Sequence, residues 1–347
     1  MSDSNDQVQK VGSHGIALQA AGSITYGLSL ADMKQLAIDL YDAQMLKLQG
    51  VAEAVARERA EQIRSEILEA ISTRNPEGVQ QAADVDFQHA LYGVQRDYAR
   101  TGNEDLGKLL VDLLVERTKA TERDIMQLVL NQALKTVAKL STTQIAAVAV
   151  IFMMKNARAN GIGTLQQFLH YVDVHLLPVA RGLKISAASV QYLVAANCGM
   201  LSMVSGPFGE IFVQTYPAFF RKGFTESAIP PGASPAFRNM LMPCLHDQSR
   251  LQVRAETIEV LDGMTKTAGL SADEIATLQT LFNSDPLSGK EVEDWLVAHR
   301  PALKDVIDAW TSSGLHAFQL NSVGQAIGHA RIRQYAPEFA DLSVWVN

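Results

Sequence analysis

The stretch STTQIAAVAVIFMMKNAR, residues 141–158, decides the fold. Ser141 followed three residues later by Gln144 is a capping-box pattern, in which each side chain satisfies a free backbone N–H at the start of a helix. Every residue from Ile145 to Met154 is apolar, so no face of this helix suits solvent. We therefore predict a central core helix with other helices packed around it.

The segments on both sides of this helix also have helical patterns. Apolar residues recur every three or four positions, which is typical of amphipathic helices. The expected helices cover residues 87–98, 106–115, 125–140, 164–180, 186–203, 322–335 and two that begin at 271 and 288. The fold class that we predict is mainly α: a multi-helix bundle with a short N-terminal β-element and two short C-terminal strands, at 315–320 and 342–346.

Ser29 begins a much longer helix, which we expect to run to about Ser72. Asp32 follows Ser29 as the acidic partner of an N-terminal cap. The apolar residues that fall largely on one face are Leu36, Leu40, Val51, Val55, Ile63, Ile67 and Ile71. A helix several times longer than the globular mean of about 11–12 residues needs a surface to pack on. We expect that surface to be a partner chain or another long helix.

The segment before this helix predicts short β-strands. Alternating residues punctuated by glycine form the pattern, and its inward positions are Ile16, Leu18, Ala20, Ile24 and Tyr26. An isolated two-stranded hairpin is marginal in water, so these strands need cover from the rest of the chain or from neighbouring copies. We assign Ile16, Leu18, Ala20, Ile24 and Tyr26 to oligomerisation and expect a homo-oligomer.

The clearest loop of the sequence is residues 223–235, which hold three prolines and two glycines. We expect a domain boundary within this loop. The resulting division is a self-association motif at 1–28, a helical core domain at 29–225 and a smaller, mostly helical C-terminal domain at 236–347.

The composition limits the class of partner and the compartment. The formal net charge is -7, and a nucleic-acid-binding surface is normally basic, so nucleic acid is not the expected main partner. Two cysteines and no signal-peptide pattern predict a cytoplasmic protein. Residues 185–204 carry no charge but hold several polar residues, so we expect a buried helix rather than a membrane span.

Sequence motifs for chemistry are missing. There is no Cys-x-x-Cys, no His-Glu-x-x-His, no phosphate-binding glycine loop and no Gly-x-Ser-x-Gly. Cys244 and His246 lie close together without a supporting motif, and Asp84 and Asp86 are expected on different sides of a helix. We assign no catalytic residue, no metal ligand and no cofactor.

The most unusual segment surrounds two cations with aromatic residues. Its candidate ligand or partner contacts are Tyr216, Phe220, Arg221, Lys222 and Phe224. One interpretation is a stacking platform with phosphate contacts. The other is a helix end whose aromatics anchor the core, with Gly223 as a left-handed cap.

The N-terminal residues carry a resemblance to a family. Gly12, the run Ala17–Ala20, Gly22, Ile24 and the run Gly27–Ser29 are similar to the start of a group of uncharacterised bacterial proteins. That group has a Gly-Asn-Ser-x-Ala-Ile-Gln-Ala-Gly-Gly-Asp-Ile type motif before a long helix. Residues 216–224, 320–330 and 342–345 resemble the same group, whereas His14 and Ser23 depart from its motif.

The resemblance implies no activity, substrate or catalytic residue, and it associates the chain loosely with bacterial antiphage defence. Our leading hypothesis is a non-enzymatic oligomeric sensor or scaffold in bacterial antiphage defence or stress response, with a protein partner or a phage-derived trigger. One alternative is a hydrolase or nuclease with a site assembled from distant residues. The other is a membrane-active effector that exposes residues 185–204.

Overall fold

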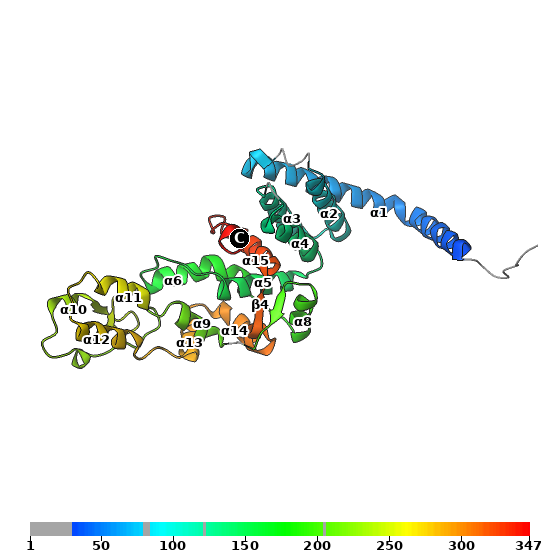
Figure 1. The fold of residues 1–347 in the computed structure, drawn as a ribbon. Helices are drawn as coiled ribbons and strands as arrows, with labels where there is room; N and C mark the ends of the chain where they lie inside the picture. Colours follow the sequence, from blue (N-terminus) through cyan, green and yellow to red (C-terminus); the bar gives the residue numbers. More distant parts are fainter. Residues whose placement is uncertain (1–29, 79–83, 121–122, 204–205) are drawn as a thin grey trace, which may run out of the picture. The chain divides into compact units, whose positions relative to one another are not determined.

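A computed structural model describes residues 30–78, 84–120, 123–203 and 206–347, with side chains described from Gly50 onward (Figure 1). The chain divides into two compact units, residues 1–58 and residues 59–347. The helices are α1 (Leu30–Arg74), α2 (Val85–Thr101), α3 (Glu104–Arg117), α4 (Ile125–Val137), α5 (Thr142–Lys155), α6 (Leu165–Tyr171), α7 (Leu177–Ala180), α8 (Ala187–Ala195), α9 (Phe208–Thr215), α10 (Pro235–Asn239), α11 (Ile258–Thr265), α12 (Ala272–Asn283), α13 (Gly289–His299), α14 (Lys304–Ser312) and α15 (Ser322–Arg333). The mainly α prediction is confirmed.

The strands are short and form two antiparallel pairs. They are β1 (Gly199–Leu201), β2 (Leu241–Pro243), β3 (Leu251–Val253) and β4 (Phe318–Leu320). β1 pairs with β4, and β2 pairs with β3. A strand within 315–320 was expected and is confirmed as β4.

The long first helix is confirmed in the first unit. α1 starts at Leu30, next to the predicted cap at Ser29, and has 45 residues, the last 16 of which, from Arg59, belong to the second unit. Within the first unit, Val51 exposes 81% of its surface and Val55 exposes 37%. The predicted β-element at 1–28 lies outside the described residues.

In the second unit, α5 is the central core helix that the sequence predicts. Both hydrogen bonds of the capping box are present: the Ser141 hydroxyl accepts from Gln144 N, and the Gln144 side chain accepts from Ser141 N. All residues from Ala147 to Met154 are buried, on every side of the helix. Burial of this kind requires neighbours all round, and the surrounding helices supply them.

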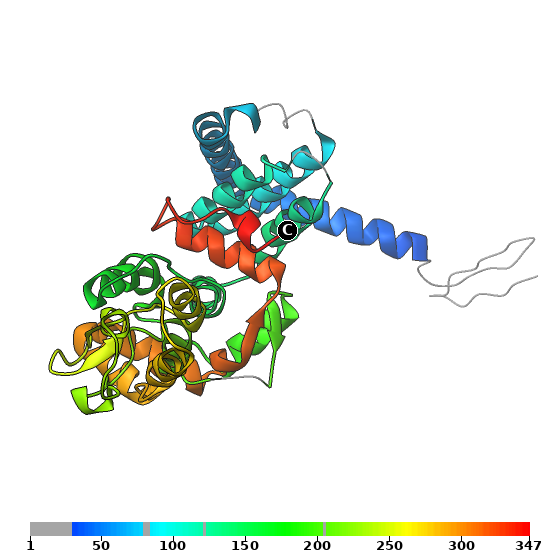
Figure 2. The ribbon, with the colours of Figure 1, turned by 60° about the vertical axis from the view of Figure 1, so that its left-hand side comes forward.

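α15 is the main neighbour of α5. It lies between α5 on one side and α3 and α4 on the other (Figures 1 and 2). Gly328 permits the close approach, because a Cβ there would lie 2.7 Å from Phe152 Cβ and 3.1 Å from the Val148 carbonyl oxygen. The C-terminal residues extend this contact, since the ring of Trp345 packs edge-on against Phe152.

Residues 59–74 of α1 pack with α2 and α3. Ile63 and Ile67 are fully buried, and Ile71 is 3% exposed. Arg59 Nη1 donates to the Ala99 carbonyl at 3.2 Å. This part of α1 therefore belongs to the same core as α5 and α15.

A smaller apolar cluster lies within residues 224–282. Phe237, Leu261 and Leu278 are its fully buried members, contributed by α10, α11 and α12. The β2–β3 pair lies beside it, with Val253 buried. Residues 292–346, by contrast, share the large core with residues 63–220. Segments on both sides of the expected boundary at 223–235 are thus packed together, and the division into domains stays a prediction.

The prediction of one helix over 186–203 is wrong. α8 ends at Ala195, because Asn197 adopts a left-handed conformation with φ 60°. Asn197 N donates to Val194 O, and Cys198 N donates to Leu193 O. These two bonds form a Schellman motif, which ends a helix and turns the chain. β1 follows directly.

The predicted strand at 342–346 is also wrong. Residues Leu342–Val344 form a 3₁₀ helix, started by the Asp341 carboxylate, which accepts from Ser343 N. The predicted helix over 164–180 forms, with a π-helical turn at Val172–Leu176 within it. Pro178 follows this turn and has no N–H to donate, which favours such a local widening.

No helix among the described residues combines the length and the apolar character needed to cross a bilayer.

Candidate functional site

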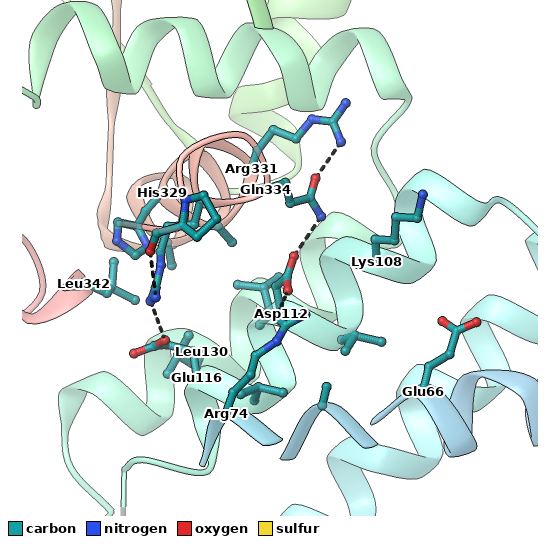
Figure 3. A pocket seen from close by; sticks show the side chains of 18 of the residues that line it. Glu66, Arg74, Lys108, Asp112, Glu116, Leu130, His329, Arg331, Gln334 and Leu342 are labelled. Carbon is teal, nitrogen blue, oxygen red and sulfur yellow. Dashed lines mark hydrogen bonds and ion pairs between the residues drawn. The ribbon is translucent and has the colours of Figure 1, made fainter. Parts of the chain in front are cut away.

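A cleft of the second unit lies between α1, α3 and α15, and its volume is about 740 Å³. Ten charged side chains line it: Glu66, Glu69, Arg74, Asp105, Lys108, Asp112, Glu116, Lys119, Arg331 and Arg333. Figure 3 labels six of these side chains, which come from helices far apart in the sequence: Glu66, Arg74, Lys108, Asp112, Glu116 and Arg331. A cleft of this size suits a small ligand.

A chain of polar contacts crosses the cleft from α15 to α1 (Figure 3). Arg331 Nη1 donates to Gln334 Oε1 at 2.6 Å, and Gln334 Nε2 donates to Asp112 Oδ2 at 2.9 Å. The other Asp112 oxygen accepts from Arg74 Nη1 at 2.5 Å. Three helices are therefore joined by side chains that remain in contact with solvent.

A second set of contacts lies beside the first. Glu116 Oε2 accepts from Arg333 at 3.3 Å and from Lys119 at 2.9 Å. Lys119 also lies 3.5 Å from Asp341. Asp112 and Glu116 are thus neutralised by cations. Glu66, Glu69, Asp105, Lys108 and Arg331 have no ion-pair partner among the described residues.

His329 lines the cleft and is 2% exposed. Its Nε2 lies 2.7 Å from the Ala340 carbonyl oxygen, so Nε2 carries a proton and donates it. Burial is the main cause that lowers the pKa of the ring to about 4. The ring is therefore neutral near pH 7.

A fully buried arginine, Arg117, is the last residue of α3. Arg117 Nη2 lies 3.2 Å from Asp84 Oδ2 and 2.9 Å from Asp86 Oδ2. Asn131 donates to the same Asp86 oxygen at 2.8 Å. Asp84 is the N-cap of α2 and precedes the helix, so the two carboxylates do not lie on different sides of it, as the sequence suggested.

The aromatic segment at 216–224 lies mostly inside the protein. Tyr216, Phe220 and Phe224 are at most 6% exposed. The Tyr216 hydroxyl accepts from Ala159 N at 2.9 Å, and Phe220 packs edge-on against Phe168. The structure supports the interpretation that these aromatics anchor the core.

The two cations of this segment differ. Arg221 donates to the carbonyls of Pro217 and Ser284 and stacks 4.8 Å from the Phe282 ring centre, and burial lowers its pKa. Lys222 is 44% exposed and pairs with Glu291 at 2.9 Å. Gly223 is left-handed with φ 70°, as expected, but it caps no helix because α9 ends at Thr215.

Cys244 and His246 do not form a nucleophile–base pair. The Cys244 thiol donates to the Arg221 carbonyl at 3.5 Å. The His246 ring packs between Phe220 and Trp295, and burial lowers its pKa. Cys198 is fully buried, and burial raises the pKa of its thiol to about 12, so this thiol stays protonated.

The remaining predicted site residues, Ile16, Leu18, Ala20, Ile24 and Tyr26, lie outside the described residues. None of the predicted site residues that the structure describes lines the cleft. Its charged residues are single members of ordinary helix faces, and no short motif marks them. Within the described ranges, no group of three or more His, Cys, Asp or Glu side chains is arranged to hold a metal ion.

Comparison with known proteins adds one finding. A family model whose description reads ":-like" matches residues 27–346, while the glycine-punctuated start lies before the matched range. No curated protein and no solved structure matches the chain. Because the match covers nearly the whole chain, the protein belongs to this uncharacterised family.

Proposed function

We propose that this chain is a non-enzymatic, self-associating sensor or scaffold of the bacterial cytoplasm, acting in antiphage defence or a stress response. The observation that carries the proposal is the surface of α1 in the first unit. Val51 and Val55 lie four residues apart, hence on one helix face, and are 81% and 37% exposed. An exposed apolar face on so long a helix favours packing against another copy.

The length and composition of α1 favour such packing energetically. Long helices in proteins owe most of their stability to packing of an apolar face. Burial of a valine side chain contributes about 1.5–3 kcal/mol. Further along the same helix, Ile63 and Ile67 are fully buried in the second unit. The N-terminal glycine-punctuated segment supplies further apolar residues for the same association.

The test is the molar mass of the purified chain in light scattering. The double variant Val51→Glu, Val55→Glu places carboxylates on the proposed contact face and should lower the mass, and so should deletion of residues 1–27. Val85 on α2 gives a matched control, because it is a valine of nearly equal exposure, 79%. Val85→Glu should leave the mass unchanged. An unchanged mass in both test variants would refute self-association through α1.

The role in defence has its own test. A bacterial host that expresses the chain should show reduced phage plating, and the α1 double variant should restore plating while accumulating to the same level. Plating that is equal with and without the chain, across a broad phage panel, would remove the defence assignment. Lys222 is the exposed member of the 216–224 segment and is the position where a protein trigger could make contact.

A second candidate function, a hydrolase or nuclease, is favoured by the charged cleft. An enzyme with a site built from distant residues requires a pocket lined by several carboxylates, and five carboxylates line this one. Glu69 and Asp105 have no ion-pair partner among the described residues and are the best candidates for acid–base work. Hydrolysis of DNA, RNA or a model phosphodiester should then be lost in Glu69→Gln, Asp105→Asn. Activity that is absent in the wild type, or equal in the variant, would reject this candidate.

A further inference from the structure

β1 and the end of α8 form an exposed apolar surface, which we call the β1 patch: Tyr192, Val194, Met200, Leu201 and Met203. These side chains are between 40% and 102% exposed. In Figure 2 the β1–β4 pair stands beside α8, with β4 leading into α15. Single exposed apolar residues are ordinary, but five of them within residues 192–203 favour an interaction site.

One side of the β1 backbone has no hydrogen-bond partner among the described residues. Met200 faces Gln319 of β4, and the neighbouring bonds Ser202 N to Ala317 O and Asn321 N to Cys198 O fix the register. In an antiparallel ladder the residues between such bonded pairs point their N–H and C=O groups outward. Gly199 and Leu201 therefore direct these groups away from β4, and no described residue bonds to them there.

Two other strand edges in the described part of the chain, those of β4 and β3, are covered. Lys155 Nζ donates to the Phe318 carbonyl at 2.9 Å, on the side of β4 that faces away from β1. Phe224 and Leu251 exchange both backbone hydrogen bonds at 2.8 Å, which extends the β2–β3 pair. Proteins usually protect an open edge with lysine, proline or a bulge, and Gly199–Leu201 has none of these.

Charge favours a second copy of the same chain as the occupant. No charged residue occurs between Lys184 and Glu210, in a chain whose formal net charge is -7. A charged surface placed against its own copy repels itself, whereas this neutral one does not. It also offers no charge that would select an acidic or basic partner.

We propose that β1 pairs antiparallel with β1 of a second copy, so that two β1–β4 pairs form one four-stranded sheet. The free backbone N–H and C=O groups of Gly199 and Leu201 bond across the two copies only when Gly199 of each copy faces Leu201 of the other. Met200 then lies directly opposite Met200 of the second copy, in a non-hydrogen-bonded pair with Cα atoms about 4.5 Å apart. Three or more strands are far more stable than an isolated pair.

This contact involves no residue of α1 and goes beyond the self-association proposed above. Each contact joins two copies by the same patch on both. A chain that carries both surfaces links more than two copies, which is what a scaffold requires.

The experiment uses opposite charges at one position of the full chain. Met200→Lys and Met200→Glu each place like charges opposite each other in the proposed pair, and each should weaken the association at least about tenfold in sedimentation velocity. A mixture of the two variants should recover it, because Lys then faces Glu. Only direct pairing of Met200 with its copy predicts this recovery, and a misfolded variant would not show it. Val344→Lys is the matched control, since Val344 is as exposed as Met200, 63% for both, and should leave the association unchanged.

The same measurements in the Val51→Glu, Val55→Glu background separate this contact from that of α1. Met200→Lys should reduce that background to a monomer, whether or not α1 self-associates. The proposal would be overturned if Met200→Lys or Met200→Glu self-associated as strongly as the wild type. It would also be overturned if the mixture of the two variants associated no more strongly than each variant alone. Loss of binding to phosphatidylglycerol vesicles in Met200→Lys, with self-association intact, would overturn it in favour of a lipid surface.

Discussion

Replacing His329 by glutamine should remove a pH dependence of stability that the buried ring imposes. In the folded chain burial lowers the pKa of His329 from 6.5 to about 4. The unfolded ring takes up its proton as the pH falls below 6.5, while the folded ring stays neutral until about 4. The unfolded state therefore binds more protons in this window, and stability falls with falling pH. Above 6.5 the contribution is fully present.

The size of the effect follows from the two pKa values. The difference between 6.5 and about 4, at about 1.4 kcal/mol for each pH unit, gives a loss on the order of 3 kcal/mol across the window. Glutamine is neutral at every pH, and its amide can still donate to the Ala340 carbonyl. His329→Gln should thus have a lower stability at neutral pH but a flatter pH profile.

The assay is urea unfolding followed by tryptophan fluorescence at several pH values between about 7.5 and 4.5. The free energy of unfolding of the wild type should fall more steeply than that of His329→Gln, by roughly 3 kcal/mol over the range. His170→Gln is the control, because His170 is exposed on α6. Parallel profiles for the wild type and His329→Gln would show that the folded ring takes up its proton freely, and the reasoning would fail.

Three further substitutions test the packing of the second unit by urea unfolding. Gly328→Val should cost about 1–3 kcal/mol, because its Cβ would lie 2.7 Å from Phe152 Cβ; an unchanged midpoint would mean that α15 does not approach α5 so closely. Arg117→Met should cost about 2 kcal/mol through loss of its contacts with two half-exposed carboxylates, and a neutral result would contradict the network. Arg74→Gln should cost less than about 1 kcal/mol, since Arg74 is 57% exposed; a larger loss would show that its bond to Asp112 holds the cleft closed.

Much of the fold was predictable because its strongest signals are local. The capping box at Ser141 and the apolar run after it define α5, and they depend on neighbours within a few residues. The early end of α8 was missed because Asn197 in a left-handed conformation resembles an ordinary helical asparagine in sequence. The 3₁₀ turn at 342–344 was missed because the same residues carry two signals. Their alternating apolar pattern indicates a strand, whereas Asp341 before them can cap a helical turn.

The cleft could not be predicted, because its contacts join distant parts of the chain. Glu116 and Arg333 are 217 residues apart, and Asp112 and Gln334 are 222 residues apart. Each of these side chains looks like the solvent-facing residue of an amphipathic helix. The aromatic segment at 216–224 gave a stronger local signal, which came from its place in the core rather than from a ligand site.

The late covering of α5 has a consequence for biosynthesis. The Trp345 indole N–H donates to the Asn156 carbonyl at the end of α5, and these residues are 189 positions apart. The ribosome therefore delivers the apolar run Ile145–Met154 of α5 long before the segment that covers it. During that interval the nascent chain is a natural client for chaperones that hold apolar segments. A stall in translation before α15 should leave an aggregation-prone intermediate, even though the same helix is buried in the complete chain.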